Sequence, residues 1–83
     1  MADEKVELLR ALQLDKEGNW DHAHRIAQSI GSQNGSRVHA YLHREEGDLA
    51  NASYWYSRCG CTAPDMSLEQ EWQQLFDELS SEV

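Results

Sequence analysis

The sequence has little proline, little cysteine and no long apolar run, and each scarcity excludes a class of structure. Proline occurs once, at Pro64, so helices can continue without interruption through most of the chain. No apolar stretch is long enough to span a bilayer, and the N-terminal MADEKVELL lacks the basic and apolar regions of a signal peptide. We therefore expect a cytoplasmic protein with no membrane segment.

The two cysteines, Cys59 and Cys61, are separated by a single glycine. A disulfide across one intervening residue is expected to be strained, so the sequence predicts reduced thiols, which fits a cytoplasmic location. Cys59 is predicted to be a small core residue, with a reactive thiol or half of a metal site as the alternative. A thiolate zinc site would need a second cysteine pair, which the sequence lacks.

Basic residues are also scarce, since 7 Lys and Arg against 15 Asp and Glu give a formal net charge of −8. Such a surface repels nucleic acid and anionic membranes, so we expect neither as a partner. From Asp65 onward the chain carries six acidic residues and no basic one. This acidic end is expected to serve solubility, with a docking site for a basic partner as the alternative.

Sequence signatures of enzymes are missing as well. There is no G-x-S-x-G nucleophile motif, no glycine-rich phosphate loop and no basic cluster for a phosphorylated ligand. A chain of 83 residues also leaves little room for an enclosed pocket. The sequence therefore predicts a protein that is not an enzyme, with no catalytic residue and no cofactor.

What the sequence does contain is helical periodicity, with almost no strand-like alternation. Glycines and N-capping residues divide it into helices, which predicts an all-α fold in one helical-repeat domain over residues 1–83. We expect one helix hairpin over about 4–31, a second over about 36–60, and a C-terminal capping helix over about 67–80. Ser36 is the predicted N-cap of the third helix, and Ser67 with Gln70 form a predicted capping box before the fifth.

The strongest internal signal is a repeat at an offset of 29 residues. This offset carries the apolar stripe of the second helix onto that of the fourth, through the pairs Trp20/Leu49, Ala23/Ala52, Ile26/Trp55, Ala27/Tyr56 and Ile30/Cys59. A single hairpin cannot bury its apolar face, so two hairpins of one design are expected to stack, with the fifth helix closing the open end. Trp20 and Leu49 should then both lie between helices.

The fourth helix resembles the second helix of a Sel1-like repeat, a member of the tetratricopeptide superfamily that typically reads D-x-x-x-A-x-x-W-Y-x-K-A. The matching positions are Asp48, Ala52, Trp55 and Tyr56, with Arg58 in place of lysine. The first helix of each hairpin departs from the pattern. The segment from His39 to Tyr56 is also similar to small stand-alone bacterial proteins of unknown function. The resemblance implies a stack of helical hairpins that binds other proteins, as an adaptor.

The sharpest chemical candidate is His39 and His43, one helical turn apart, together with Glu46. These three side chains would share one face of a helix, and two histidines at this spacing can bind one metal ion. The sequence nevertheless favours a structural or surface role for all three and no bound metal, with the metal site as the alternative. His22 and His24 flank the apolar stripe of the second helix, so a polar pocket would form if the histidines converged; otherwise they serve hydrogen bonding between helices.

For a protein or peptide partner, the expected surface is one face of the first and third helices. The partner-binding candidates are the side chains that point away from the stripe of the third helix, joined by an aromatic residue of the fourth: His39, Tyr41, His43, Arg44 and Tyr54. Tyr54 is a candidate only if the fifth helix leaves it uncovered. Self-association into a homo-oligomer through leftover apolar surface is a further alternative.

Overall fold

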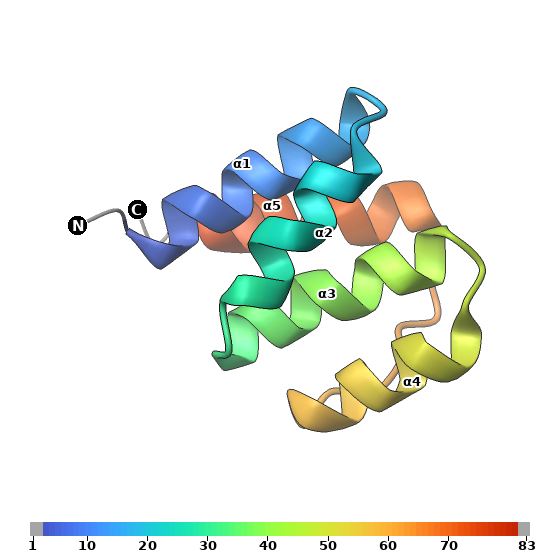
Figure 1. Cartoon of the computed structure of the whole chain (residues 1–83). Helices are drawn as coiled ribbons and strands as arrows, with labels where there is room; N and C mark the ends of the chain where they lie inside the picture. Colours follow the sequence, from blue (N-terminus) through green and yellow to red (C-terminus); the bar gives the residue numbers. More distant parts are fainter. Residues whose placement is uncertain (1–2, 82–83) are drawn as a thin grey trace.

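The computed structural model describes residues 3–81, which form five helices joined by short turns and one longer connection (Figure 1). The helices are α1 (Glu4–Lys16), α2 (Trp20–Ser29), α3 (Gln33–Glu45), α4 (Leu49–Arg58) and α5 (Leu68–Ser81). Over the described residues the all-α expectation is confirmed.

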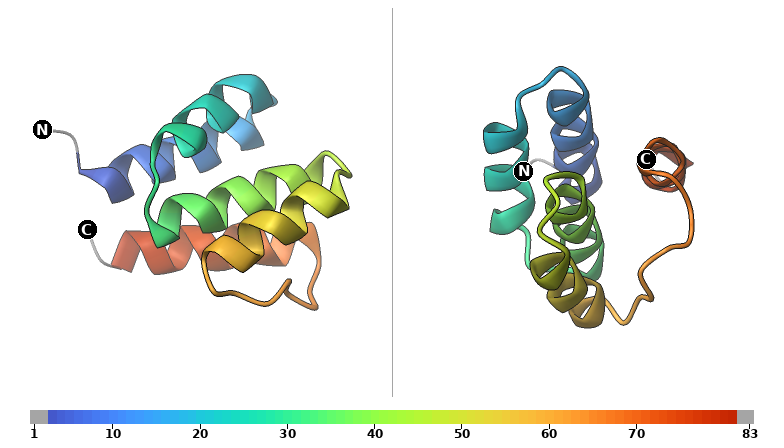
Figure 2. Two further views of the ribbon diagram at one scale, coloured as in Figure 1. Left: turned by 60° about the horizontal axis from the view of Figure 1, so that its bottom comes forward. Right: turned by 90° about the vertical axis from the view of Figure 1, so that its right-hand side faces the viewer.

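Helices α1 and α2 form one hairpin, α3 and α4 form the next, and the hairpins meet where α2 packs against α3. The central element is α3, because it contacts all four other helices. Figure 2 shows α5 standing alone on the far side of α1 and α3 from α2. Side chains of α3 therefore have neighbours on almost every side. This bears on the predictions that placed side chains of the third helix at a partner surface.

The position of α5 differs from the expectation that it closes the open end of the stack. After α4 the chain runs back across the molecule, and α5 packs on α1 and α3 rather than alongside the backbone of α4 (Figure 2). A helix with a continuous apolar seam buries most area where two other helices offer a groove, and α1 and α3 form such a pair. The face of α1 and α3 expected to bind a partner is therefore covered by α5.

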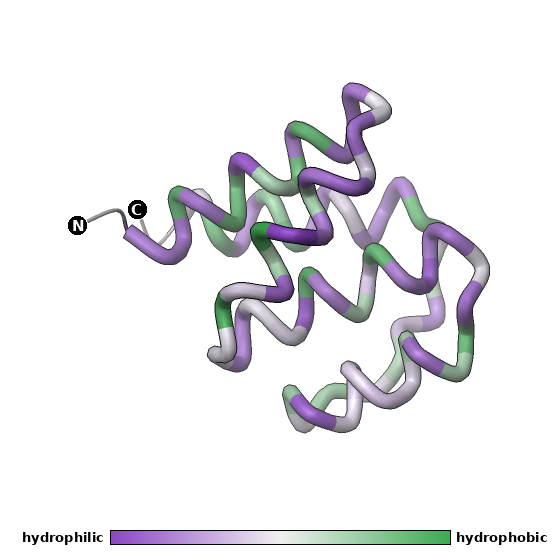
Figure 3. The backbone as a smooth tube through the Cα atoms, in the orientation of Figure 1, coloured by the Kyte–Doolittle hydropathy of each residue, from purple (hydrophilic) through white to green (hydrophobic). Residues whose placement is uncertain are grey.

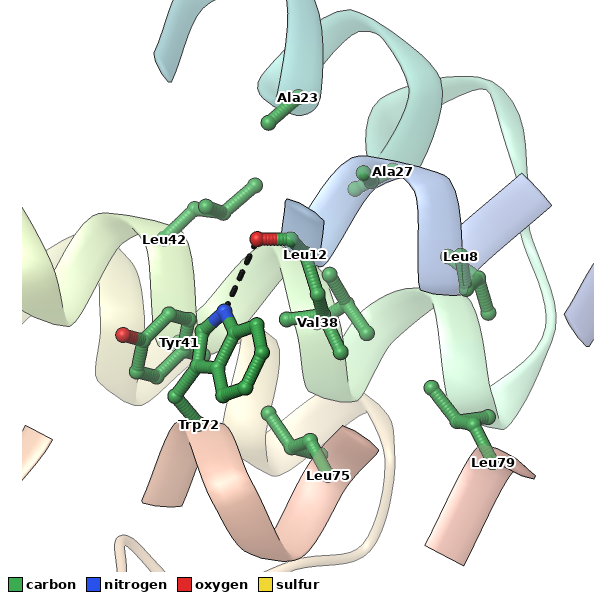
Figure 4. Close-up of a cluster of buried hydrophobic side chains, with 11 residues drawn as sticks. Leu8, Leu12, Ala23, Ala27, Val38, Tyr41, Leu42, Trp72, Leu75 and Leu79 are labelled. Atoms are coloured by element: carbon green, nitrogen blue, oxygen red, sulfur yellow. Dashed lines mark hydrogen bonds between the residues drawn. The ribbon is translucent and has the colours of Figure 1, made fainter. Parts of the chain in front are cut away.

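The main core lies between α5 and the two hairpins (Figure 4). Trp72 of α5 reaches across to α1, where its indole Nε1 donates a hydrogen bond of 2.9 Å to the backbone oxygen of Leu12. The ring of Phe76 stacks on that indole. The remaining fully buried members include Leu8, Ala11, Ala23, Ala27, Val38, Tyr41, Leu42, Leu75 and Leu79. These positions lie on α1, α2, α3 and α5.

Helix ends agree with the sequence except at α3. Ser67 and Gln70 exchange reciprocal hydrogen bonds before α5, so the predicted capping box is confirmed. The expected cap at Ser36 is wrong, because the N-cap of α3 is Ser32, four residues earlier, and its hydroxyl accepts a hydrogen bond from the N–H of Gly35. Glycine is needed there, since a Cβ at position 35 would lie 2.0 Å from the backbone oxygen of Ile30.

Cys59 and Cys61 form a disulfide, so the expectation of reduced thiols is wrong. Gly60 adopts a left-handed conformation with φ of +71°, which reverses the chain after α4. This turn leaves the two Cα atoms 5.3 Å apart, inside the range that a disulfide spans. Cys59 is buried, as predicted for a core residue, but the disulfide removes the reduced-thiol argument for a cytoplasmic location.

A buried polar network ties α5 to the second hairpin. The carboxylate of Glu71 accepts a 2.7 Å hydrogen bond from Arg44 Nη1 of α3 and a 2.6 Å hydrogen bond from the Tyr56 hydroxyl of α4. Arg44 Nη2 also donates to the backbone oxygen of Met66, just before α5. Arg44 was expected to face a partner, but its guanidinium instead makes these hydrogen bonds within the chain. A buried carboxylate with two charge-assisted partners holds α5 in one orientation.

Trp20 and Leu49, which were both expected to lie between helices, differ in their burial. Trp20 is half-buried against the core and its Nε1 donates a 2.9 Å hydrogen bond to the backbone oxygen of Leu42. Leu49 is 67% exposed, so its predicted burial is wrong. The reason is that α3 follows α2 and covers Trp20, whereas no helix of the described chain follows α4 on the equivalent side. The outer face of α4 is left open.

Apolar positions are interspersed with polar ones along every helix, as the alternating colours in Figure 3 show. Within residues 3–81, no helix combines the length and the apolar character needed to cross a membrane.

Candidate metal centre

Three histidine side chains from two helices meet where the hairpins pack together. His24 comes from α2, and His39 and His43 come from successive turns of α3. One ring nitrogen of each lies within 4.8 Å of the ring nitrogens offered by the other two. The spacing of four residues puts His39 and His43 on one side of α3, and the packing of α2 on α3 brings His24 to the same point.

The imidazole rings are in direct contact. His24 Nε2 and His39 Nε2 lie 3.0 Å apart, and the ring centroid of His43 is 5.0 Å from that of His24 and 4.8 Å from that of His39. At this distance the two Nε2 atoms share one proton as a hydrogen bond when both rings are neutral. The same two nitrogens are also close to the separation of about 3.3 Å that two ligands have on a tetrahedral zinc ion with bonds of about 2.0–2.1 Å.

Two tryptophans hold the cluster from either side. The indole of Trp20 stacks on His24 with ring centroids 4.8 Å apart, and the indole of Trp55 stacks on His39 at 4.0 Å. His39 and His43 are 4% and 6% exposed, while His24 is half-buried and forms the solvent side of the cluster. The stacked aromatic rings restrict rotation of the imidazoles, so the three nitrogens are positioned before any ligand arrives.

The environment favours neutral imidazoles. Burial, together with the neighbouring His24 and His43 rings, lowers the pKa of His39 to about 4. Burial and the adjacent His43 also lower the pKa of His24. Metal ions bind only the neutral form of imidazole, so protons compete weakly for these two nitrogens at neutral pH.

Glu46 has a role different from the one predicted. Its carboxylate oxygen Oε1 lies 2.7 Å from Nδ1 of His43, and it does not join the three-histidine group. A carboxylate on Nδ1 holds a proton there, which leaves the Nε2 lone pair of His43 free for a metal ion. The structure therefore groups His24, rather than Glu46, with His39 and His43, and it places Glu46 against Nδ1 of His43.

Glu46 and Asp48 also form a second potential group with His43, in which the ligand atoms lie within 4.8 Å of one another. Both carboxylates are exposed, and the His43 atom that faces Glu46 is already hydrogen-bonded. Hydrated carboxylates at a helix end are ordinary surface features, so the three-histidine group is the stronger candidate.

The other sequence-predicted residues lie apart from this centre or inside the fold. Tyr41 is 3% exposed and packs in the main core, so the expectation that it faces a partner is wrong. The same holds for His39 and His43, because α2 and α4 cover the sides of α3 that were expected to be free. Tyr54 is 52% exposed on α4, with its hydroxyl 3.1 Å from Arg58 Nη1. Among the described residues, His22 does not belong to the cluster.

Sequence reasoning named His24 only as a residue that could converge with the others. Its position beside the apolar stripe of α2 was visible, but many edge positions face water. A sharper signal is that His24 stands one helical turn after Trp20, as His43 stands one turn after His39. Each pair places two rings on one side of its helix, where α2 and α3 pack together.

Comparisons of this chain with protein-family models, with curated proteins and with solved structures found no match. The centre therefore has to be interpreted from its own geometry.

Proposed function

We propose that this protein binds a divalent transition-metal ion of the zinc type through His24, His39 and His43. The observation that carries the proposal is the convergence of three imidazole nitrogens within 4.8 Å, from two different helices. Histidines on the surface of a single helix do not produce such an arrangement by periodicity alone. It requires the contact between the hairpins.

The chemistry of the ligand set selects the metal. Neutral imidazole suits zinc, copper and nickel, whereas magnesium and calcium prefer carboxylate and carbonyl oxygens. The lowered pKa values of His24 and His39 keep these ligands neutral, and the carboxylate of Glu46 supports His43 from its other nitrogen. A carboxylate behind a metal-binding histidine is a common supporting contact in zinc sites.

Titration calorimetry of the metal-free protein with Zn²⁺ tests the proposal. We expect one ion per chain, with affinity falling at least about 100-fold in His24→Ala, because two ligands remain. Glu46→Gln should weaken binding by about 10-fold to 100-fold, since it removes the carboxylate behind His43. His22→Ala is the matched control, because it deletes an imidazole from the same helix outside the cluster, and its affinity should equal that of the unsubstituted protein.

His24 is the best residue to substitute first because its side chain is half-buried, so its loss should disturb the fold less than loss of His39. Circular dichroism of each variant checks that the helices persist. Equal zinc affinity in His24→Ala and in the unsubstituted protein would overturn the proposal, as would binding that depends on His22.

Protein binding is the second candidate function, as part of a helical-repeat stack of the Sel1-like or tetratricopeptide type. The face of α1 and α3 is occupied by α5, so the candidate surface is the outer face of α4, where Leu49 and Tyr54 are exposed. Helix α4 carries no acidic residue, although the chain has a net charge of −8. Two copies of such an acidic chain repel each other least at this face, so the proposed occupant is the α4 of a second copy.

Sedimentation velocity over a range of protein concentrations tests this second candidate. We expect the sedimentation coefficient to rise with concentration, and Leu49→Asp to abolish the rise by replacing an exposed apolar side chain with a carboxylate. Leu68→Asp, at an exposed leucine of α5, is the matched control and should associate as the unsubstituted protein does. A concentration-independent monomer would contradict self-association through α4.

A further inference from the structure

We propose that a metal ion held by His24, His39 and His43 keeps one exchangeable coordination position, which takes water, hydroxide or a small monodentate anion. This inference rests on the proposed metal-binding function and concerns what the bound ion can do. Three protein ligands with an open fourth position are typical of zinc ions that bind and activate small molecules, whereas structural zinc ions have four protein ligands.

The number of available protein ligands is the first support. In the part of the chain that the structure describes, the cluster has three members. The nearest carboxylate, Glu46, is hydrogen-bonded to Nδ1 of His43, which points away from the side where Nε2 would meet the ion. Glu46 therefore orients a ligand and leaves the fourth position without a protein group.

The flanking aromatic residues are the second support. An indole offers an N–H donor and no lone pair for a metal ion, so neither Trp20 nor Trp55 can complete the coordination. The Trp20 N–H is, moreover, already donated to the backbone oxygen of Leu42. Both indoles lie flat against imidazole rings, so they flank the cluster with rigid walls. The fourth position is therefore left to a ligand from outside the chain.

Access is the third support. His39 and His43 are buried, while His24 is half-buried at the solvent side of the contact between the hairpins. An exogenous ligand would therefore reach the ion past His24. Partial exposure of His24 suits an exchangeable ligand better than a sealed structural ion would.

Charge balance indicates which ligands the position prefers. Three neutral imidazoles leave the double positive charge of the ion uncompensated, because the carboxylate of Glu46 is outside the ligand set. An anion at the open position lowers that charge. With water there, the ion favours loss of one proton to solvent, leaving bound hydroxide, and zinc ions with three histidine ligands do this near pH 7.

Cobalt substitution of the full chain tests the inference, because Co²⁺ reports its coordination through visible absorption. One equivalent of Co²⁺ should give an absorption spectrum typical of four-coordinate cobalt. Added sodium azide should then shift the bands with saturation at one azide per cobalt. Without azide, the spectrum should also change in a single step between about pH 6 and pH 9 as bound water loses its proton.

The outcomes separate this inference from the proposed function. Cobalt that binds one to one through the three histidines, with a spectrum unchanged by excess azide, would leave metal binding intact and overturn the open position. Failure of both Zn²⁺ and Co²⁺ to bind would overturn both. His22→Ala should respond to azide as the unsubstituted protein does, and a lost response in that variant would place the azide site elsewhere and contradict the inference.

Discussion

Trp72→Ala is expected to lower the free energy of unfolding by about 3–5 kcal/mol, the range for removing a buried aromatic side chain. The indole is buried between α5 and the hairpins, and it donates a hydrogen bond to the backbone oxygen of Leu12 (Figure 4). It also stacks on Phe76, and the ammonium of Lys16 lies over the indole, 4.4 Å from the ring centroid. Substitution removes these contacts together and leaves a cavity where α5 meets α1.

Urea unfolding followed by circular dichroism measures the change. Since small domains have a total stability of about 5–15 kcal/mol, Trp72→Ala can unfold the chain outright. Trp72→Phe is the companion variant, because it keeps most of the ring and removes the N–H, and we expect it to remain folded. Its cost should be smaller than that of Trp72→Ala but above about 1 kcal/mol, the contribution of one hydrogen bond. If the free energy of unfolding fell by less than about 1 kcal/mol in both variants, the observed packing of α5 on α1 would be contradicted.

Glu45→Gln is expected to raise stability by about 2 kcal/mol at pH 9 while leaving it nearly unchanged at pH 4.5. Burial, and a hydrogen bond and charge repulsion with Asp15, raise the pKa of Glu45 to about 8. Among the described residues, Glu45 Oε1 is buried without a hydrogen-bond donor, and a proton between the two carboxyl groups supplies one. The folded state therefore holds a proton that the unfolded chain releases near pH 4.5.

The direction of this pH dependence follows from the number of protons that the folded and unfolded states bind. Because the folded state keeps the Glu45 proton between about pH 4.5 and pH 8 while the unfolded chain has lost it, the contribution of Glu45 to stability falls as pH rises through this window. The lowered pKa values of His24 and His39 act in the opposite direction below about pH 6.5, so the Glu45 contribution is read from the difference between the variant and the unsubstituted protein. The expected gain of about 2 kcal/mol allows for the water that reaches the half-buried Glu45 side chain and weakens the effect of its raised pKa. Glutamine cannot ionise and can donate to Asp15, so the contribution of Glu45 to the pH dependence should disappear.

Thermal or urea unfolding at several pH values between 4.5 and 9 measures this slope. Glu69→Gln is the matched control, because it removes one formal charge at an exposed position of α5 and should keep the slope of the unsubstituted protein. A pH dependence of stability that is the same in Glu45→Gln and in the unsubstituted protein would show that another group holds the proton.

Metal binding at the hairpin contact would also have a structural consequence. His24 belongs to the first hairpin and His39 and His43 to the second, so one ion would join the two units. An ion that binds the folded state and not the unfolded chain stabilises it by about 2.7 kcal/mol at a free concentration 100 times its dissociation constant. The packing of the two hairpins and the metal centre would then support each other.

Some features of this protein were readable from residue order alone, because they depend on contacts within one helix. The apolar stripes, the cap at Ser67 and the repeat offset of 29 residues predicted five helices and two hairpins. The spacing of His39 and His43 predicted that they share a face of α3. Helical periodicity fixes such relations within a few residues, so no knowledge of the rest of the fold is needed.

The tertiary structure decided everything that depends on which helix covers which. It placed α5 on α1 and α3, which buried Tyr41 and left Leu49 exposed. It also brought His24 to His39 and turned Glu46 into the partner of His43 Nδ1. Contacts between helices far apart in the chain depend on how apolar area is shared among all five, and a pattern read along one helix carries no such information.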